Sequence, residues 1–275
     1  MNIQKLASFT QNGQGGNPAG VVIQDILPDV SDMQQTAAEV GYSETVFAAP
    51  HQGGFRTRYF APQQEVPFCG HATIALGAAL GQAFGAKGYD LILNETSISV
   101  SAYREGDDWG AKLISPPTKH QPVPPNTLEA FLQLFGISET DLDPEIAPAW
   151  IHGGADHLLL PLARHDLLRD MSYDFDAGAA LMQAHDLVTV NLIWRENPTQ
   201  IHSRNAFAGH GVYEDSATGA AAAALAGYLR DVGHQDSGFE VTQGVDMGRP
   251  SLLQVKPRAG QGAPIEISGL TAPIT

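Results

Sequence analysis

Cysteine, aromatic residues and positive charge are all scarce in this 275-residue chain. It has one cysteine, 8% aromatic residues, and 15 Lys and Arg against 30 Asp and Glu, for a formal net charge of −15. A single cysteine excludes an internal disulfide and any site of several thiolates, and it suits a reducing compartment. The acidic balance argues against nucleic acid and anionic membrane surfaces as partners, because both attract basic proteins.

Long apolar segments are missing as well. The sequence has no 18-residue apolar run, and residues 1–6 (MNIQKL) lack the apolar core of a signal peptide. We therefore expect a cytoplasmic protein with no membrane partner. Hydrophobic residues make up 43% of the chain and charged residues 16%, which is typical of folded proteins, and the length suggests two domains of ordinary size.

One pattern occurs twice: a short turn that runs directly into a helix rich in small residues. Residues 69–76 read CGHATIAL, and residues 218–225 read TGAAAAAL. A constant offset of 149 residues pairs Gly70 with Gly219 and continues along both helices. The repeat predicts two related domains, each built on one such helix.

Many short apolar segments surround these helices and are typical of strands. Strands are predicted at residues 2–10, 20–25, 44–48, 55–60, 90–94, 96–103, 109–115, 148–152, 157–161, 187–195, 239–243 and 251–256. Further helices are predicted from an N-cap at Ser31–Asp32 to Gly41, near 127–135 and near 178–184. The expected fold class is α+β, with a mixed sheet curled around one helix in each half.

A proline-rich segment, residues 115–125, predicts the linker between the two halves. Proline cannot donate to a strand ladder, so this segment is not expected to join a sheet. The predicted domains are residues 1–118 and 119–275, and the last residues are free to cross back to the first domain.

The starts of the two repeated helices are candidate anion-binding sites. The first N–H groups of a helix are unpaired, and the helix dipole is positive at that end. Two such ends facing each other would bind a carboxylate through Cys69 and Gly70 on one side and Thr218, Gly219 and Ala220 on the other. The alternative is two Ala-rich core helices that only happen to begin with glycine.

Three polar side chains near these turns could handle a proton. Glu44 opens an apolar strand, so partial burial should raise the pKa of its carboxyl group toward neutrality; a surface glutamate is the simpler alternative. Asp215 lies three residues before Thr218, where it would cap the helix and point into the cleft. His71 lies at a helix start whose dipole should lower its pKa and keep it neutral, although a packing histidine is equally consistent.

Other motif-like segments carry less information. Residues 13–18 (GQGGNP) are similar to a dinucleotide loop, but Pro replaces the third glycine and no helix follows, so a turn between strands is the better interpretation. His152 and His157 match no helical ligand pair, and the ten histidines are scattered, so no metal is expected. Cys69 and His71 lie two residues apart, a spacing at which side chains rarely form a hydrogen bond, so a Cys–His nucleophile is not expected.

Five segments resemble the phenazine-biosynthesis isomerase (PhzF-like) family. They are residues 16–21 (GNPAGV), 43–47 (SETVF), 65–73 (EVPFCGHAT), 214–219 (EDSATG), and 243–244 (QG) with 247–251 (MGRPS). The resemblance implies a diaminopimelate-epimerase-like fold of two similar domains, each a β-barrel wrapped around a central helix, with the site between them. It also implies a homodimer that uses neither cofactor nor metal.

The same resemblance assigns roles to individual residues. In the best-understood member of the family, a glutamate shuttles a proton between carbons of a dihydro-hydroxyanthranilate, and that glutamate matches Glu44. The family's supporting glycine, histidine and aspartate match Gly70, His71 and Asp215. The chain departs from the family pattern at Ala220, where a serine hydroxyl expected to touch the substrate is missing while the backbone N–H remains.

We therefore expect a cofactor-independent isomerase of a small carboxylate-bearing molecule, acting by general acid/base catalysis in an interdomain cleft. One alternative is an amino-acid racemase or epimerase. It is disfavoured because the counterpart of Cys69 at the 149-residue offset is Thr218, which is too weak an acid to be a second base. Another is a non-catalytic ligand-binding protein of the same fold, which the missing hydroxyl at Ala220 favours and the three convergent polar groups oppose.

Overall fold

The structure is a computed structural model that describes residues 1–274, and the chain forms two compact units. The first unit comprises Met1–Ile114 and the segment from Ser268 onward, and the second comprises Ser115–Ile267. The end of the chain therefore belongs to the first unit. The sequence places the boundary after residue 118, and the structure places the change of unit at Ile114 and Ser115.

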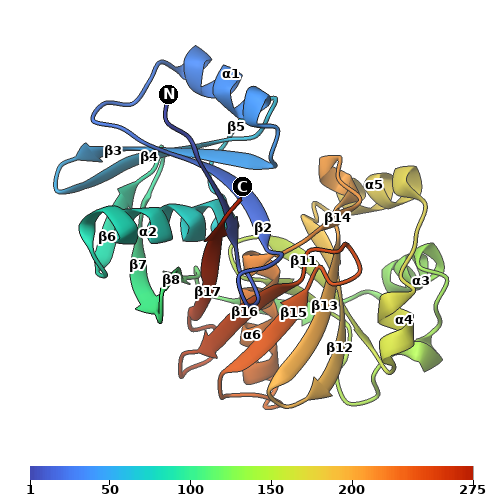
Figure 1. The fold of residues 1–275 in the computed structure, drawn as a ribbon. Coiled ribbons are helices and arrows are strands. Elements are labelled where there is room, and N and C mark those ends of the chain that lie inside the picture. Colours follow the sequence, from blue (N-terminus) through green and yellow to red (C-terminus); the bar gives the residue numbers. More distant parts are fainter. Residues whose placement is uncertain (275) are drawn as a thin grey trace. The chain divides into compact units, whose positions relative to one another are not determined.

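The first unit is a closed barrel of eight strands around one helix (Figure 1). Its elements are β1 (Gln4–Ser8), β2 (Asn17–Ile23), α1 (Val30–Val40), β3 (Glu44–His51), β4 (Gly54–Phe60), β5 (Glu65–Val66), α2 (Gly70–Phe84), β6 (Gly88–Ile92), β7 (Ser97–Glu105), β8 (Asp108–Ile114) and most of β17 (Ile265–Pro273). Strands pair in the order β17, β1, β2, β3, β4, β6, β7, β8 and back to β17. This confirms the mixed α+β class and a barrel around a central helix.

Helix α2 fills the interior of this barrel because its residues are small on every side. It packs against β1, β2, β3, β7 and β8, and every residue from His71 to Gly81 is buried. A Cβ atom on Gly77 would lie 2.6 Å from Val100 Cγ2, and one on Gly81 would lie 2.6 Å from Ala102 Cβ. Glycine therefore lets the strands approach the helix backbone directly, which fixes the start of α2 within the barrel.

The second unit repeats the scheme with a row of strands around α6. Its elements are β9 (Lys119–Pro122), α3 (Pro125–Leu134), η1 (Glu139–Asp141), β10 (Ala149–His152), β11 (Asp156–Leu162), α4 (His165–Arg169), α5 (Phe175–Ala184), β12 (Thr189–Asn197), β13 (Gln200–Ala206), η2 (Ala208–His210), β14 (Glu214–Asp215), α6 (Gly219–Asp231), β15 (Phe239–Gln243) and β16 (Ser251–Pro257). The pairing order is β9, β10, β11, β12, β13, β15, β16. Strands from both ends of this row pack against α6, so the sheet curls around it.

Several expectations about individual elements are wrong. The proline-rich segment does join a sheet: Lys119–Pro122 forms β9 and pairs with β10, at the end of the row, where proline is tolerated. Helix α1 begins at Val30 with Asp29 as its N-cap, not at Ser31–Asp32. Strands β13 and β17 do not appear among the predicted strands. Gly41 does end α1 in the left-handed conformation, with φ 71°.

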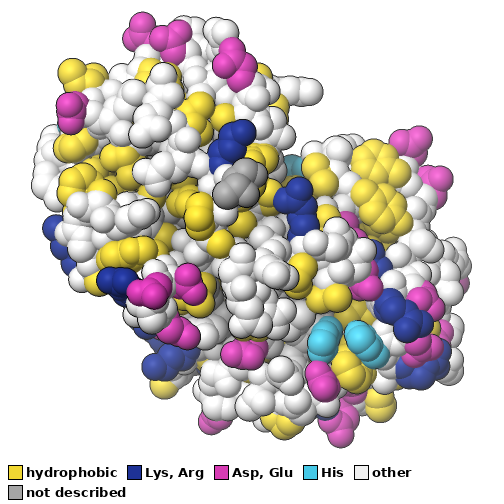
Figure 2. Space-filling model, in the orientation of Figure 1, with side chains coloured by type: hydrophobic (Ala, Val, Ile, Leu, Met, Phe, Trp, Pro, Cys, Tyr) yellow, Lys and Arg dark blue, Asp and Glu magenta, His cyan; other side chains and the backbone are white. Residues whose placement is uncertain are grey.

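Surface charge and helix length agree with the composition. Acidic and basic side chains lie intermixed on the face shown in Figure 2, without a continuous basic patch. Over residues 1–274, every helix is too short or too polar to cross a bilayer.

A polar network is buried across β11, β12 and β13 of the second unit. Thr189 Oγ1 donates to Asn205 Oδ1 at 2.8 Å and lies 2.7 Å from His157 Nδ1. Because the threonine proton is already used, Nδ1 of His157 carries the hydrogen of that contact. Nε2 of His157 has no hydrogen-bond partner within the described part of the chain. Burial lowers the pKa of His157 to about 3, so its ring stays neutral in the folded protein.

This histidine predicts a loss of stability in acid. The unfolded chain binds a proton on His157 near pH 6.5, while the folded protein does not do so until about pH 3. The free energy of unfolding should therefore fall as pH drops from 6.5 toward 3, by up to about 1.4 kcal/mol per pH unit. His157→Asn keeps a donor for Thr189 and does not titrate, so urea unfolding across this range should show a shallower slope. Equal slopes in the two proteins would contradict the prediction.

Candidate functional site

Glu44 is the first residue of β3, where the strand enters the barrel of the first unit. Residues 45–49 behind it are buried, and the strand pairs with β2 through Ala19 opposite Glu44. The Glu44 side chain keeps 19% of its surface exposed. It is therefore a carboxylate held at the rim of an apolar barrel, with access to a ligand from one side.

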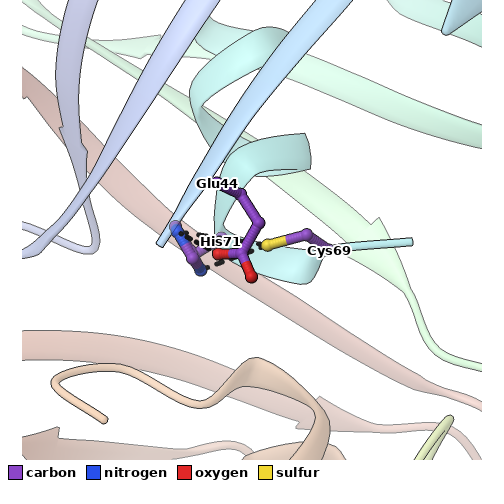
Figure 3. Close-up of side chains that lie close together, drawn as sticks. All are labelled: Glu44, Cys69 and His71. Atoms are coloured by element: carbon purple, nitrogen blue, oxygen red, sulfur yellow. Dashed lines mark hydrogen bonds and ion pairs between the residues drawn. The ribbon is translucent and has the colours of Figure 1, made fainter. Parts of the chain in front are cut away.

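Cys69 and His71 lie at the start of α2 and point toward Glu44 (Figure 3). His71 Nε2 lies 3.4 Å from Glu44 Oε2, and His71 Nδ1 lies 3.3 Å from Cys69 Sγ. The expectation that Cys69 and His71 do not reach each other is wrong. Cys69 is the N-cap residue with an extended backbone, φ −145° and ψ 120°, and the turn into the helix brings the two side chains to one side.

Hydroxyl groups form hydrogen bonds or close contacts around Glu44, Cys69 and His71, which we call the triad. Ser8 Oγ donates to the carbonyl of His71 at 2.7 Å, and Thr73 Oγ1 donates to the carbonyl of Cys69 at 2.7 Å. Tyr59 OH lies 2.7 Å from Thr73 Oγ1, and burial raises the pKa of Tyr59, so its hydroxyl remains a donor. Ser43 Oγ lies 3.4 Å from His71 Nε2. These four residues are not among the predicted site residues, although Ser43 and Thr73 lie within segments that resemble the family.

Gly70 leaves open space beside the triad. A Cβ atom at this position would meet nothing within 4 Å. The first N–H groups of a helix have no partner inside the helix, and the dipole there is positive. The start of α2 can therefore receive an anionic group next to Glu44 and His71.

The second unit has its own polar cluster at the start of α6. The side chain of Thr218, the N-cap residue, donates a hydrogen bond from Oγ1 to Asp215 Oδ2 at 2.7 Å. The Thr218 side chain therefore makes no capping hydrogen bond to a backbone N–H of α6. Asp215 thus contacts the residue at the start of α6, and its capping role stays a prediction. Gly219 and Ala220, the first helical residues, are half-buried.

Gln243 organises this cluster and is not among the predicted site residues. Its Oε1 accepts from the Thr218 N–H at 3.1 Å, while its Nε2 donates to the Asp215 carbonyl at 2.8 Å and lies 3.0 Å from Thr218 Oγ1. One amide therefore connects β15, β14 and α6. The only signal for it in the sequence is its place in the QG segment that resembles the family.

The structure thus groups the predicted residues within each unit. Glu44, Cys69, Gly70 and His71 gather in the first unit, and the second unit gathers the predicted residues Asp215, Thr218, Gly219 and Ala220. A carboxylate beside an imidazole and a thiol can accept a proton from a ligand and return it.

Comparisons with known proteins agree with this architecture. Residues 6–274 match the family described as phenazine biosynthesis-like protein, PhzC-PhzF. The chain is 33% identical over 271 residues to trans-2,3-dihydro-3-hydroxyanthranilate isomerase of Pseudomonas fluorescens, covering 92% of this chain and 90% of that protein. The chain belongs to the PhzF family. Like that relative, the chain is an isomerase.

Solved structures show the same fold. The phenazine biosynthesis protein of the PhzF family from Bacillus anthracis superposes with a TM-score of 0.86 at 20% identity, covering 99% of this chain and 96% of that one. A predicted epimerase from Pseudomonas aeruginosa gives a TM-score of 0.84 at 26% identity, again with 99% and 96% coverage. The chain has the PhzF fold, which a predicted epimerase shares.

Proposed function

We propose that this PhzF-family isomerase moves a proton on a small carboxylate-bearing substrate without a cofactor, with Glu44 as the general acid and base. The contact of Glu44 Oε2 with His71 Nε2 at 3.4 Å, beside the open start of α2, is the observation that carries the proposal. The name of the Pseudomonas fluorescens relative supports a substrate in the class of cyclic amino or hydroxy carboxylates.

Each group has a distinct part in the proposed reaction. The substrate carboxylate binds the N–H groups at the start of α2, near Gly70, where the helix dipole stabilises its charge. Glu44 removes a proton from a carbon next to an activating group and returns it to another carbon of the same molecule. His71 donates a hydrogen bond to the charge that develops during transfer. A well-placed acid/base of this kind contributes roughly 10²- to 10⁴-fold in rate.

The proposal gives the α6 cluster a part in the same reaction. Asp215 would polarise the substrate, with Gln243 and Thr218 holding it in position, while Gly219 and Ala220 would offer backbone N–H groups to the substrate. The same proposal includes three expectations from the sequence. They are a site in an interdomain cleft, a homodimer and a cytoplasmic location.

Two alternatives make different predictions. An amino-acid racemase exchanges the Cα hydrogen of an amino acid with solvent and interconverts its enantiomers, whereas the proposed isomerase moves a double bond within the product. A protein that only binds ligands exchanges no hydrogen. The 26% identity to a predicted epimerase is the reason to test the racemase alternative as well.

Solvent-exchange measurements distinguish the three. The protein is incubated in deuterated water with trans-2,3-dihydro-3-hydroxyanthranilate, with other cyclic and aliphatic carboxylates and with amino acids, and each is followed by NMR. We expect deuterium at a new carbon of a cyclic carboxylate together with a shifted double bond. Exchange confined to the Cα of an amino acid would favour the racemase. Thermal stabilisation by a carboxylate that shows no exchange would favour the binding protein.

A further inference from the structure

The three side chains at the rim of the first unit are also a donor set for a metal ion. Glu44, Cys69 and His71 each offer one ligand atom, and these atoms lie within 4.8 Å of one another. Figure 3 shows the carboxylate, thiol and imidazole converging from β3 and from the start of α2. Carboxylate, thiolate and imidazole are the ligands that Zn²⁺ uses in proteins.

Two of the distances between these atoms are close to those of a tetrahedral site. Zinc bond lengths place neighbouring nitrogen and oxygen ligands about 3.4 Å apart, and neighbouring sulfur and nitrogen ligands about 3.6 Å apart. His71 Nε2 lies 3.4 Å from Glu44 Oε2 and 4.0 Å from Cys69 Sγ. The first distance matches two corners of a tetrahedron and the second slightly exceeds the spacing of a third, while Cys69 Sγ and the Glu44 carboxylate lie within 4.8 Å of each other. These three residues leave the fourth corner open.

Charge and surroundings favour a divalent cation at this place. A thiolate and a carboxylate together neutralise two positive charges, which matters because Cys69 and His71 are buried. The formal net charge of −15 also attracts cations to the protein. Ser43 Oγ lies 3.4 Å from His71 Nε2, so a metal bound to this nitrogen would replace that contact.

The geometry points to a regulatory site in which Zn²⁺, or a cation of similar preference for sulfur and nitrogen, binds Glu44, Cys69 and His71 and stops proton transfer. The thiol loses its proton to solvent on binding, so affinity rises with pH. Binding of the cation stands on the donor geometry alone. The inhibitory effect rests on the proposed function, because the bound carboxylate is then unable to accept a substrate proton.

Cobalt provides a selective optical probe of this site. Co²⁺ takes the place of Zn²⁺ in tetrahedral sites, and a bound thiolate adds a charge-transfer band in the near ultraviolet. Cys69 is the sole cysteine of the chain, so any such band reports on Cys69. We expect the band to saturate at one Co²⁺ per chain and to disappear when Zn²⁺ is added.

Variants test the other two ligands. Cys69→Ser should abolish the band, and Glu44→Gln and His71→Asn should each weaken Co²⁺ affinity at least as much as the roughly 10- to 100-fold that loss of an outer-sphere partner costs. His202→Asn is the matched control, because it removes a surface histidine 2.8 Å from Glu196 Oε2 and leaves the triad intact. Circular dichroism establishes that each variant is folded.

The outcomes separate the metal site from the proposed reaction. No charge-transfer band at saturating Co²⁺, or a band of equal affinity in the Glu44→Gln and His71→Asn variants, overturns the metal site whatever the enzyme does. A normal band with turnover that Zn²⁺ leaves unchanged overturns the inhibitory role and counts against Glu44 as the catalytic base. The expected result is a normal band with turnover that falls in proportion to Zn²⁺ occupancy and returns with EDTA.

Discussion

Replacing Glu44 with glutamine should lower turnover by roughly 10²- to 10⁴-fold, the contribution of a positioned general acid/base. Glutamine has nearly the shape of glutamate and can still contact His71, so the fold and the binding of substrate should change little. The substitution removes only the ability to take up and return the proton. We therefore expect kcat to fall with KM almost unchanged, and deuterium incorporation from solvent to fall by the same factor as kcat.

A second glutamate provides the matched control for this variant. Glu39 lies exposed on α1 and accepts a hydrogen bond from Gln35 Nε2 at 2.9 Å, so Glu39→Gln makes the same chemical change away from the triad. It should retain full turnover. If Glu44→Gln keeps turnover within a few fold of the original protein, Glu44 is not the catalytic acid/base. A simultaneous large loss in Cys69→Ala would assign that role to the thiol.

The parts of the fold that the sequence could predict are those with local signals. Helices α2 and α6 are predictable because a glycine turn and a run of small apolar residues define them within a dozen positions, and Gly41 ends α1 for a similarly local reason. The pairing of β9 and the return of β17 to the first unit depend on partners far apart in sequence. Periodicity within a short window contains no information about such partners.

The same distinction between local and long-range signals applies to the residues of the candidate site. Glu44 and His71 could be named in advance because each lies next to a recognisable turn or strand start. The contact between Cys69 Sγ and His71 Nδ1 at 3.3 Å depends on the backbone angles of an N-cap residue, which spacing alone does not supply. The role of Gln243 depends on β15 lying beside the start of α6. Gln243 and Thr218 are 25 residues apart in the sequence, so a local pattern does not predict their contact.

The largest effect on stability is expected at Arg204, which lies on β13 two residues before the end of the strand. Its Nε and Nη2 donate to the two carboxylate oxygens of Glu214 at 2.9 and 2.5 Å, and its Nη1 donates to the carbonyl of Arg169 at 2.8 Å. Burial by itself lowers the pKa of Arg204, but the paired carboxylate outweighs burial and raises it overall. Both side chains are almost fully buried, with 10% and 4% of their surface exposed. This pair anchors β14, whose second residue is Asp215.

Arg204→Met should therefore destabilise the protein by about 3–5 kcal/mol, because Glu214 is left as a buried charge without a partner. Adding Glu214→Met should recover part of this loss, since two apolar side chains of similar volume leave no charge unpaired, although the Arg169 carbonyl still loses its donor. Urea unfolding of the two single variants and the double variant measures the coupling directly. A double variant that loses the sum of the two single losses would show that the charges act independently, and the buried pair would then not be what holds β14 and Asp215 in place.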